Sequence, residues 1–205
     1  MKRAIDACVR GDVWWVCEMN GIAPIYLLPT REWIRALAKY IDSLRVRTVL
    51  EVAAGDGFLS RCLAAQCPRL RIIATDDGSW EKANARMTTR ERRTYAGHDV
   101  RGLALGNNVQ RLTAQRAVQQ YRPDLVLISW APPGRLVERV IRGPCKYVLD
   151  FGTEGNECGG GPLLWRHAQD FVEGPVEKLA WCRLDERSAE PRHTRVTLYH
   201  GARWQ

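Results

Sequence analysis

The sequence lacks the features that would assign it to a membrane or to an export pathway. No apolar run in its 205 residues approaches the roughly 20 residues that a membrane-spanning helix needs. Its first residues, Met1-Lys-Arg-Ala-Ile-Asp, contain no continuous apolar stretch of signal-peptide length. We therefore expect a cytoplasmic protein that makes no use of a membrane.

Paired cysteine and histidine ligands are also lacking. The seven cysteines are odd in number and form no C-x-x-C pair, and the four histidines show no H-x-x-x-H spacing. We expect reduced, mostly buried thiols, no disulfide framework and no metal site. The chain contains no internal repeat and no low-complexity segment, so its length fits one α/β domain.

Acidic residues are in the minority. Lysine and arginine number 31 against 23 aspartates and glutamates, which gives a net charge of +8. A basic surface can bind nucleic acid, or it can simply be a solvated face. The densest basic cluster, residues 86–93, has no interleaved aromatic residues on which bases would stack. Nucleic acid is therefore a partner that the composition allows but does not favour.

The most informative stretch that the chain does contain is TVLEVAAGDGFLSRCLAA, residues 48–65. Its first five residues form an apolar run rich in β-branched side chains, which predicts a buried parallel strand. Residues 58–64 carry apolar side chains at helical spacing. A glycine turn between a strand and a helix lets the backbone approach a nucleotide closely. The stretch therefore predicts a nucleotide-binding turn.

The spacing within this turn favours one class of nucleotide. A dinucleotide-binding turn needs a third glycine where this chain has Ser60, so a nicotinamide-dependent oxidoreductase is disfavoured. The stretch Glu51-Val-Ala-Ala-Gly-Asp-Gly57 resembles the E-x-G-x-G-x-G first motif of class I S-adenosylmethionine-dependent methyltransferases, with Ala53 in place of the first glycine. The resemblance implies that Glu51 engages the cofactor through the loop or a water. It also implies that the cofactor's methionine part lies over Ala53, Gly55, Asp56 and Gly57.

An acid follows the second predicted strand, residues 70–75. Asp76 lies about twenty residues beyond the glycine turn, where an acid can accept hydrogen bonds from both ribose hydroxyls. Asp76 fits the second motif of the methyltransferase family best. Asp77 is the alternative, because a shift of one residue would exchange them.

The assignments between the second and fourth strands depend mainly on order along the chain. Residues 95–100 are predicted as the third strand, and Asp99 would then hold the adenine amino group, as the family resemblance implies. Trp80 is a candidate to cover the adenine ring. Asn108 is predicted to cap a helix over residues 109–121.

The fourth predicted strand, residues 124–129, runs directly into Trp130-Ala-Pro-Pro133. Two prolines leave nearby carbonyl groups free to accept from a ligand. The stretch loosely resembles the N-P-P-Y fourth motif of methyltransferases, without its asparagine. Ser129 and Trp130 are therefore predicted to contact the cofactor. Trp130 is also a candidate to stack on a planar substrate, the alternative being that it packs beneath the loop.

The rest of the chain supplies candidate bases and closes the sheet. A fifth strand over residues 146–151 opens into a glycine-rich loop that carries Glu154 and Glu157, which join His98 as candidates for a general base. Helices are predicted over residues 135–142 and 163–172. Strands over residues 176–184 and 194–200 are predicted to close the sheet.

The segment before the first core strand contains one clear helix. Thr30 is a predicted N-cap, and residues 31–42 place Trp33 and other apolar side chains on one stripe. We expect residues 1–47 to form a helical cap over the cofactor site. The alternative is that tryptophans such as Trp33 pack in the core.

Together these patterns predict an α/β, single-domain, Rossmann-like methyltransferase fold. Its sheet is mostly parallel and seven-stranded, flanked by helices, with the last strand antiparallel. Residues 48–205 would form the catalytic domain, which binds S-adenosyl-L-methionine and releases S-adenosyl-L-homocysteine. The expected acceptor is an oxygen or nitrogen of a small molecule or short peptide, because only about 45 residues precede the core. The alternatives are an RNA or DNA methyltransferase and a non-catalytic nucleotide-binding protein of the same fold.

Overall fold

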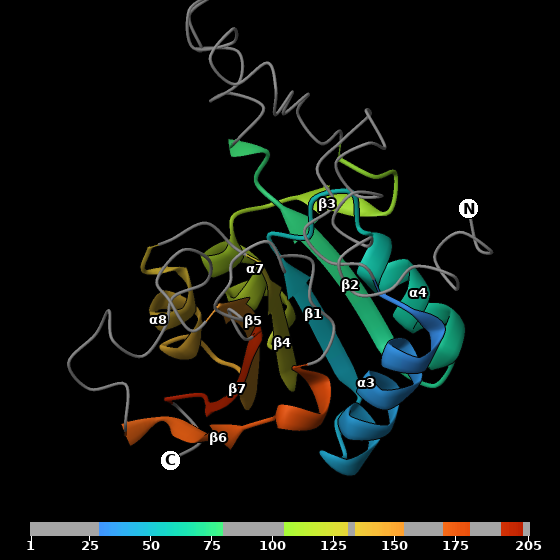
Figure 1. Cartoon of the computed structure of the whole chain (residues 1–205). Helices are drawn as coiled ribbons and strands as arrows, with labels where there is room; N and C mark the ends of the chain where they lie inside the picture. Colours follow the sequence, from blue (N-terminus) through green and yellow to red (C-terminus); the bar gives the residue numbers. More distant parts are fainter. Residues whose placement is uncertain (1–28, 80–104, 131–133, 154–169, 181–193, 203–205) are drawn as a thin grey trace, which may run out of the picture.

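A seven-stranded sheet runs through the part of the chain described by the computed structural model, residues 29–79, 105–130, 134–153, 170–180 and 194–202 (Figure 1). The strands are β1 (Thr48–Val52), β2 (Arg71–Asp76), β3 (Val109–Arg111), β4 (Leu125–Ser129), β5 (Tyr147–Thr153), β6 (Val172–Pro175) and β7 (Thr194–His200). The helical elements are α3 (Arg31–Ser43), α4 (Phe58–Gln66), α7 (Ala114–Tyr121), α8 (Leu136–Ile141) and the short 3₁₀ helix η4 (Glu177–Leu179).

The strand order is β3-β2-β1-β4-β5-β7-β6. The pairs among β1 to β5 are parallel, whereas β7 runs antiparallel to both β5 and β6. This is the mostly parallel sheet with an antiparallel last strand that the sequence predicts. The order reverses between β1 and β4, and ligands of open α/β sheets bind beside such a reversal, at the carboxyl ends of the strands.

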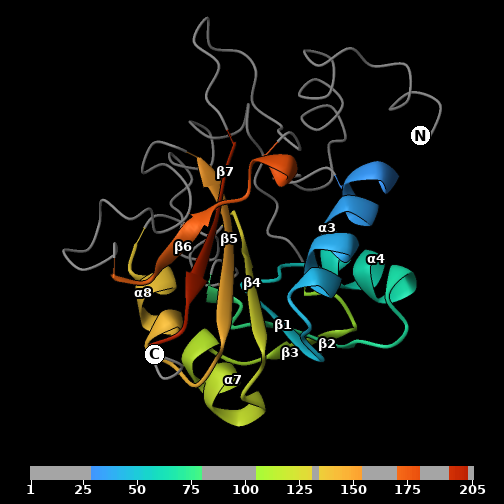
Figure 2. The ribbon, with the colours of Figure 1, turned by 90° about the horizontal axis from the view of Figure 1, so that it is seen from below.

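Helices cover both faces of the sheet (Figures 1 and 2). One face packs against α3 and α4, and its core includes Leu37, Leu63 and Leu127. The other face packs against α7 and α8, with Leu50 and Val126 in its core. Alternate residues of the central strands enter the two cores, which explains why these strands are continuously apolar.

Helix α3 belongs to the first of these cores. Its N-cap is Thr30, as predicted, whose Oγ1 accepts from the backbone N–H of Trp33 at 3.2 Å. The Trp33 side chain is fully buried, and its Nε1 donates to the carbonyl of Leu179 at 2.9 Å. Its ring packs edge-on against the ring of Phe151, with 5.4 Å between the two ring centroids. Trp33 is therefore a core residue, and the predicted cap over the site rests on residues 1–28, which lie outside the described residues.

The predicted helix over residues 109–121 is wrong in its first part. Residues 109–111 form β3 and pair with Ala74–Asp76 of β2. The helix begins at Ala114, after Thr113, whose Oγ1 accepts from the N–H of Arg116 at 3.5 Å. A three-residue strand has too few residues for its period of two to show, so the sequence pattern indicates only the helix that follows it. Residues 95–100, predicted as the third strand, lie outside the described residues.

The predicted strand over residues 176–184 is wrong over residues 176–180, and residues 181–184 lie outside the described residues. The strand that pairs with β7 is β6, Val172–Pro175, and the chain then turns into η4. The register of β6 shifts between Val172 and Gly174, an irregularity that breaks the period of two. Strand β7, Thr194–His200, lies where the sequence predicts it. The helix predicted over residues 163–172 overlaps β6 at its last residue, and residues 163–169 are outside the described part.

Candidate functional site

The turn between β1 and α4 is built for glycine. Gly55 and Gly57 have φ values of +56° and +68°, in the left-handed region that favours glycine. A Cβ on Gly57 would lie 2.6 Å from both Asn108 Nδ2 and Val109 Cγ2. The turn therefore packs directly against the segment that leads into β3, and an alanine at residue 57 would disturb both.

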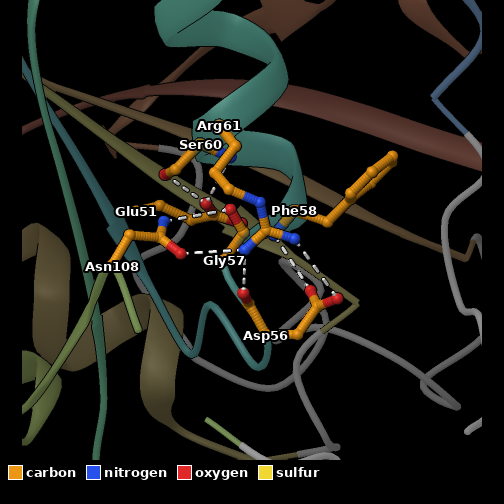
Figure 3. A network of polar contacts seen from close by, with 7 residues as sticks. All are labelled: Glu51, Asp56, Gly57, Phe58, Ser60, Arg61 and Asn108. Carbon is orange, nitrogen blue, oxygen red and sulfur yellow. Dashed lines mark hydrogen bonds and ion pairs between the residues drawn. The ribbon is translucent and has the colours of Figure 1, made fainter. Parts of the chain in front are cut away.

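Glu51 links β1 to the first turn of α4. It lies in β1 with 3% of its surface exposed, and its Oε2 accepts from the backbone N–H of Ser60 at 3.0 Å and from the Ser60 hydroxyl (Figure 3). Ser60 lies in the first turn of α4, where N–H groups have no partner within the helix, and Gly57 has no side chain to cap them. Glu51 supplies that cap, while its predicted role toward a cofactor stays a prediction.

Burial changes the acidity of Glu51. It raises the pKa of this carboxyl to about 7, and the two hydrogen bonds from Ser60 oppose the rise. The nearby carboxyls of Asp56 and Asp76 add to it. Glu51 is therefore a buried acid that titrates near neutral pH.

A second network joins the turn to α4 and to the segment before β3 (Figure 3). Asp56 Oδ1 accepts from the N–H of Phe58 at 2.9 Å. Arg61 Nη1 donates to the carbonyl of Asp56 at 2.6 Å and to Asn108 Oδ1 at 2.8 Å, and Asn108 Nδ2 donates to the carbonyl of Gly57 at 3.2 Å. Sequence reasoning missed Arg61 and treated Asn108 as a helix cap. Because 47 residues separate the two, no local pattern predicts their contact.

Asp76 joins the second strand to the turn. It is the last residue of β2, buried to 6% exposure, and its Oδ2 accepts from the N–H of Gly55 at 2.9 Å. Its Oδ1 accepts from the N–H of Gly78 at 2.8 Å. Each carboxylate oxygen keeps a second lone pair for a further donor. Asp77 is exposed, and its Oδ1 accepts from the N–H of Ser79, so the structure brings Asp76 to the turn and leaves Asp77 outside it.

Ala53 adopts a left-handed conformation, with φ of +53°. Replacing it by glycine is expected to raise the free energy of unfolding by about 0.5 to 1 kcal/mol, because relief of left-handed strain exceeds the entropy that glycine adds to the unfolded chain. Urea denaturation measures the change. The control is Ala54→Gly at the next residue, which is buried and has no positive φ, and which we expect to destabilise by about 1 kcal/mol. Equal effects of the two variants would contradict the prediction.

Two buried polar side-chain atoms, one in the middle of β5 and one on the residue that follows β4, have no partner among the described residues. Trp130 follows Ser129 at the end of β4, its N–H donates to the carbonyl of Phe151 at 2.9 Å, and its indole Nε1 is unpaired. Asp150 in β5 is fully buried, and its Oδ1 is unpaired. Its Oδ2 meets Arg195 Nη2 of β7 at 2.5 Å. The unpaired donor therefore follows the end of β4, whereas the unpaired acceptor lies in the middle of the neighbouring strand β5.

Asp150 was missed by sequence reasoning. Its signal is a single acid inside the otherwise apolar run Val148–Phe151, where a solvated strand face would not be expected. Burial raises the pKa of Asp150, while Arg195 opposes the rise. Asp150 and Arg195 thus form a buried ion pair between β5 and β7.

The remaining sequence-predicted residues lie outside the described residues. They are Trp80, His98, Asp99, Glu154 and Glu157, and their roles stay predictions. Within the described ranges, no group of three or more histidine, cysteine, aspartate or glutamate side chains is arranged to hold a metal ion. No helix in those ranges has the length and apolar character to cross a membrane.

No protein-family model and no curated protein sequence matches the chain. Similar solved structures include TrmK of M. capricolum in complex with S-adenosyl-homocysteine, at 9% identity and a TM-score of 0.47, covering 86% of this chain and 70% of that one. The 23S rRNA methyltransferase ErmE has 17% identity and a TM-score of 0.45, with the same two coverages of 86% and 70%.

A third similar structure is the S-adenosylmethionine-dependent methyltransferase SibL, at 17% identity and a TM-score of 0.43. The match covers 82% of this chain and 54% of SibL, so the chain spans about half of that protein's length. The fold itself is established by the strand order, the antiparallel β7 and the glycine turn after β1. The chain has the Rossmann-like fold of the class I S-adenosylmethionine-dependent methyltransferases.

Proposed function

We propose that the chain is an S-adenosylmethionine-dependent methyltransferase that acts on an oxygen or nitrogen of a small molecule or short peptide. The observation that carries the proposal is the hydrogen bond from the Gly55 N–H to Asp76 Oδ2, 2.9 Å long. It joins the acid that ends β2 to the glycine turn that begins α4. The groups suited to a ribose and to the methionine part of the cofactor therefore lie side by side.

The chain's residues fit this cofactor. Asp76 keeps one lone pair on each oxygen, which suits two ribose hydroxyls. Gly55 and Gly57 carry no side chain, and their left-handed backbone makes the tight turn between β1 and α4. When bound, S-adenosylmethionine supplies a methyl group on a positively charged sulfur.

The ends of β4 and β5 are where the acceptor would lie, beside the reversal in strand order. The unpaired indole N–H of Trp130, which directly follows β4, suits a small molecule that offers a hydrogen-bond acceptor. Transfer then needs the attacking atom held about 3 Å from the methyl group with water excluded. A base is needed only if that atom carries a proton, and His98, Glu154 and Glu157 remain the candidates.

A second candidate is a methyltransferase that acts on RNA or DNA. The observation that favours it is the net charge of +8. The two candidates share the cofactor and differ in the acceptor. A test of the cofactor therefore comes first.

Calorimetric titration with S-adenosylmethionine and S-adenosylhomocysteine is expected to show micromolar binding of both and no binding of NAD. Asp76→Asn should weaken both by about 10- to 100-fold, because it removes the charged acceptor for the ribose hydroxyls. The matched control is Asp77→Asn, which alters an exposed acid outside the turn and should bind as the wild type does.

Three outcomes would count against parts of this proposal. Absence of binding of either sulfur nucleotide by a folded wild-type protein would overturn it. Loss of binding in Asp77→Asn alone would show that the two acids had been exchanged. Tight cofactor binding without transfer to any acceptor would favour the non-catalytic alternative.

A further inference from the structure

Exposed arginines gather at the amino edge of the sheet, the edge opposite the glycine turn. The amino-edge cluster consists of Arg45, Arg47, Arg69, Arg71 and Arg122, all exposed. Backbone hydrogen bonds bring their segments together: the N–H of Arg71 donates to the carbonyl of Arg47 at 3.0 Å, and the N–H of Asp124 to the carbonyl of Thr48 at 3.1 Å. The cluster is thus one continuous surface made from the loops that enter β1, β2 and β4.

Two of these loops repeat the same pattern. In each, an apolar residue stands between two arginines, Val46 before β1 and Leu70 before β2. Val46 is 7% exposed and Leu70 packs against the same core cluster. Because the middle residue is anchored in the core, the arginines on both sides of it are held at the surface.

Among the described residues two acids, Asp42 and Asp124, lie beside the five arginines, so positive charge is in excess at the cluster. None of its arginines forms an ion pair with a residue in the described ranges. Of the adjacent acids, Asp124 accepts with Oδ2 from the N–H groups of Arg47 and Thr48, and Asp42 is exposed at the end of α3. The guanidinium of Arg71 lies over the ring of Tyr121 at 6.0 Å, which orients it and adds an aromatic surface.

Two of the arginines occupy strained positions. Arg45 follows the end of α3 with φ of +54°, and Arg122 caps α7 with φ of +42°. Where a helix ends in a left-handed residue, that residue is usually glycine or asparagine. A cation can stabilise a helix C-terminus from the last turn without this strain. Arginine at both positions therefore places charge at a conformational cost.

We propose that the amino-edge cluster binds the phosphate backbone of a nucleic acid. Guanidinium groups bind phosphate through several hydrogen bonds, and adjacent strands would space them about 5 Å apart. An anionic membrane fits less well, because the exposed large apolar side chain among the described residues is Phe58, at the other edge. The cluster lies away from the glycine turn, so docking there is independent of the proposed methyl transfer.

The test uses the full chain and fluorescence anisotropy with labelled oligouridylate and oligothymidylate of about 20 nucleotides. The wild type is expected to bind at least one of them, with an affinity that falls steeply between about 50 and 200 mM salt. The double variant Arg45→Gly/Arg122→Gly removes two cations and also relieves the left-handed strain, so it should fold. We expect its affinity to fall at least about tenfold. The slope of log K against log salt concentration should become shallower by about 1.4, because each of the two lost phosphate contacts contributes about 0.7 on a single strand.

The matched control is Arg116→Gln/Arg139→Gln, which removes two exposed arginines on α7 and α8 outside the cluster. It should bind as the wild type does. Absence of wild-type binding to either polymer at low salt would overturn the proposal, and so would an equal loss in the control, which would indicate a bulk charge effect. Titration with S-adenosylmethionine should be the same in all these variants, which keeps this test separate from that of the proposed function.

Discussion

Replacing Trp33 by alanine is expected to lower the free energy of unfolding by about 4 kcal/mol. The indole is fully buried between α3 and the sheet, and the cavity left behind would be large. The substitution also leaves the carbonyl of Leu179 without the donor it meets at 2.9 Å. Urea denaturation measures the change through a shift of the midpoint with an unchanged slope.

Trp33→Phe is the matched control. It keeps most of the buried apolar surface and the contact with Phe151, and it loses the hydrogen bond to Leu179. We expect it to cost about 1 to 2 kcal/mol. A cost below about 1 kcal/mol for Trp33→Ala, together with weaker cofactor binding, would contradict the core assignment and return α3 to the cap role that the sequence suggests.

The elements that the sequence predicts correctly are those with strong local signals. Strand β1 is a run of β-branched residues followed by glycines, and α3 begins after a threonine that caps it. The missed elements, β3 and β6, have three and four residues, and their exposure alternates or is high throughout. Such short strands form because the edge of another strand is available for pairing. That strand lies far away in the sequence, so the residues of the short strand do not predict the pairing.

The candidate site divides in the same way. The glycine turn and Asp76 follow from spacing along the chain. The contact between Arg61 and Asn108 joins residues 47 apart, and that between Asp150 and Arg195 joins residues 45 apart. Neither pair has a pattern in the sequence, because each exists only once the strands have been ordered in the sheet. The sequence also does not predict that Glu51 accepts from Ser60, because this contact forms only when α4 packs on β1.

Replacing Glu51 by glutamine is expected to change how stability depends on pH. Burial raises the pKa of Glu51 from 4.5 to about 7 in the folded protein, so the folded state binds the proton more tightly than the unfolded state does. The stability that this proton provides is fully present below about pH 4.5 and is lost as the pH rises through about 7. The loss amounts to about 3 kcal/mol above neutral pH.

Glutamine resembles the protonated acid in shape and keeps an acceptor for the N–H of Ser60. Glu51→Gln should therefore match the wild type near pH 4.5 and exceed it by about 3 kcal/mol above pH 7, as measured by urea denaturation across this range. Ser60→Ala is the matched control. It removes a hydrogen bond that lowers the pKa of Glu51, so its stability should fall more with rising pH than that of the wild type. All other titrating groups are shared by these proteins, so parallel pH profiles for the wild type and Glu51→Gln would show that Glu51 keeps an ordinary pKa.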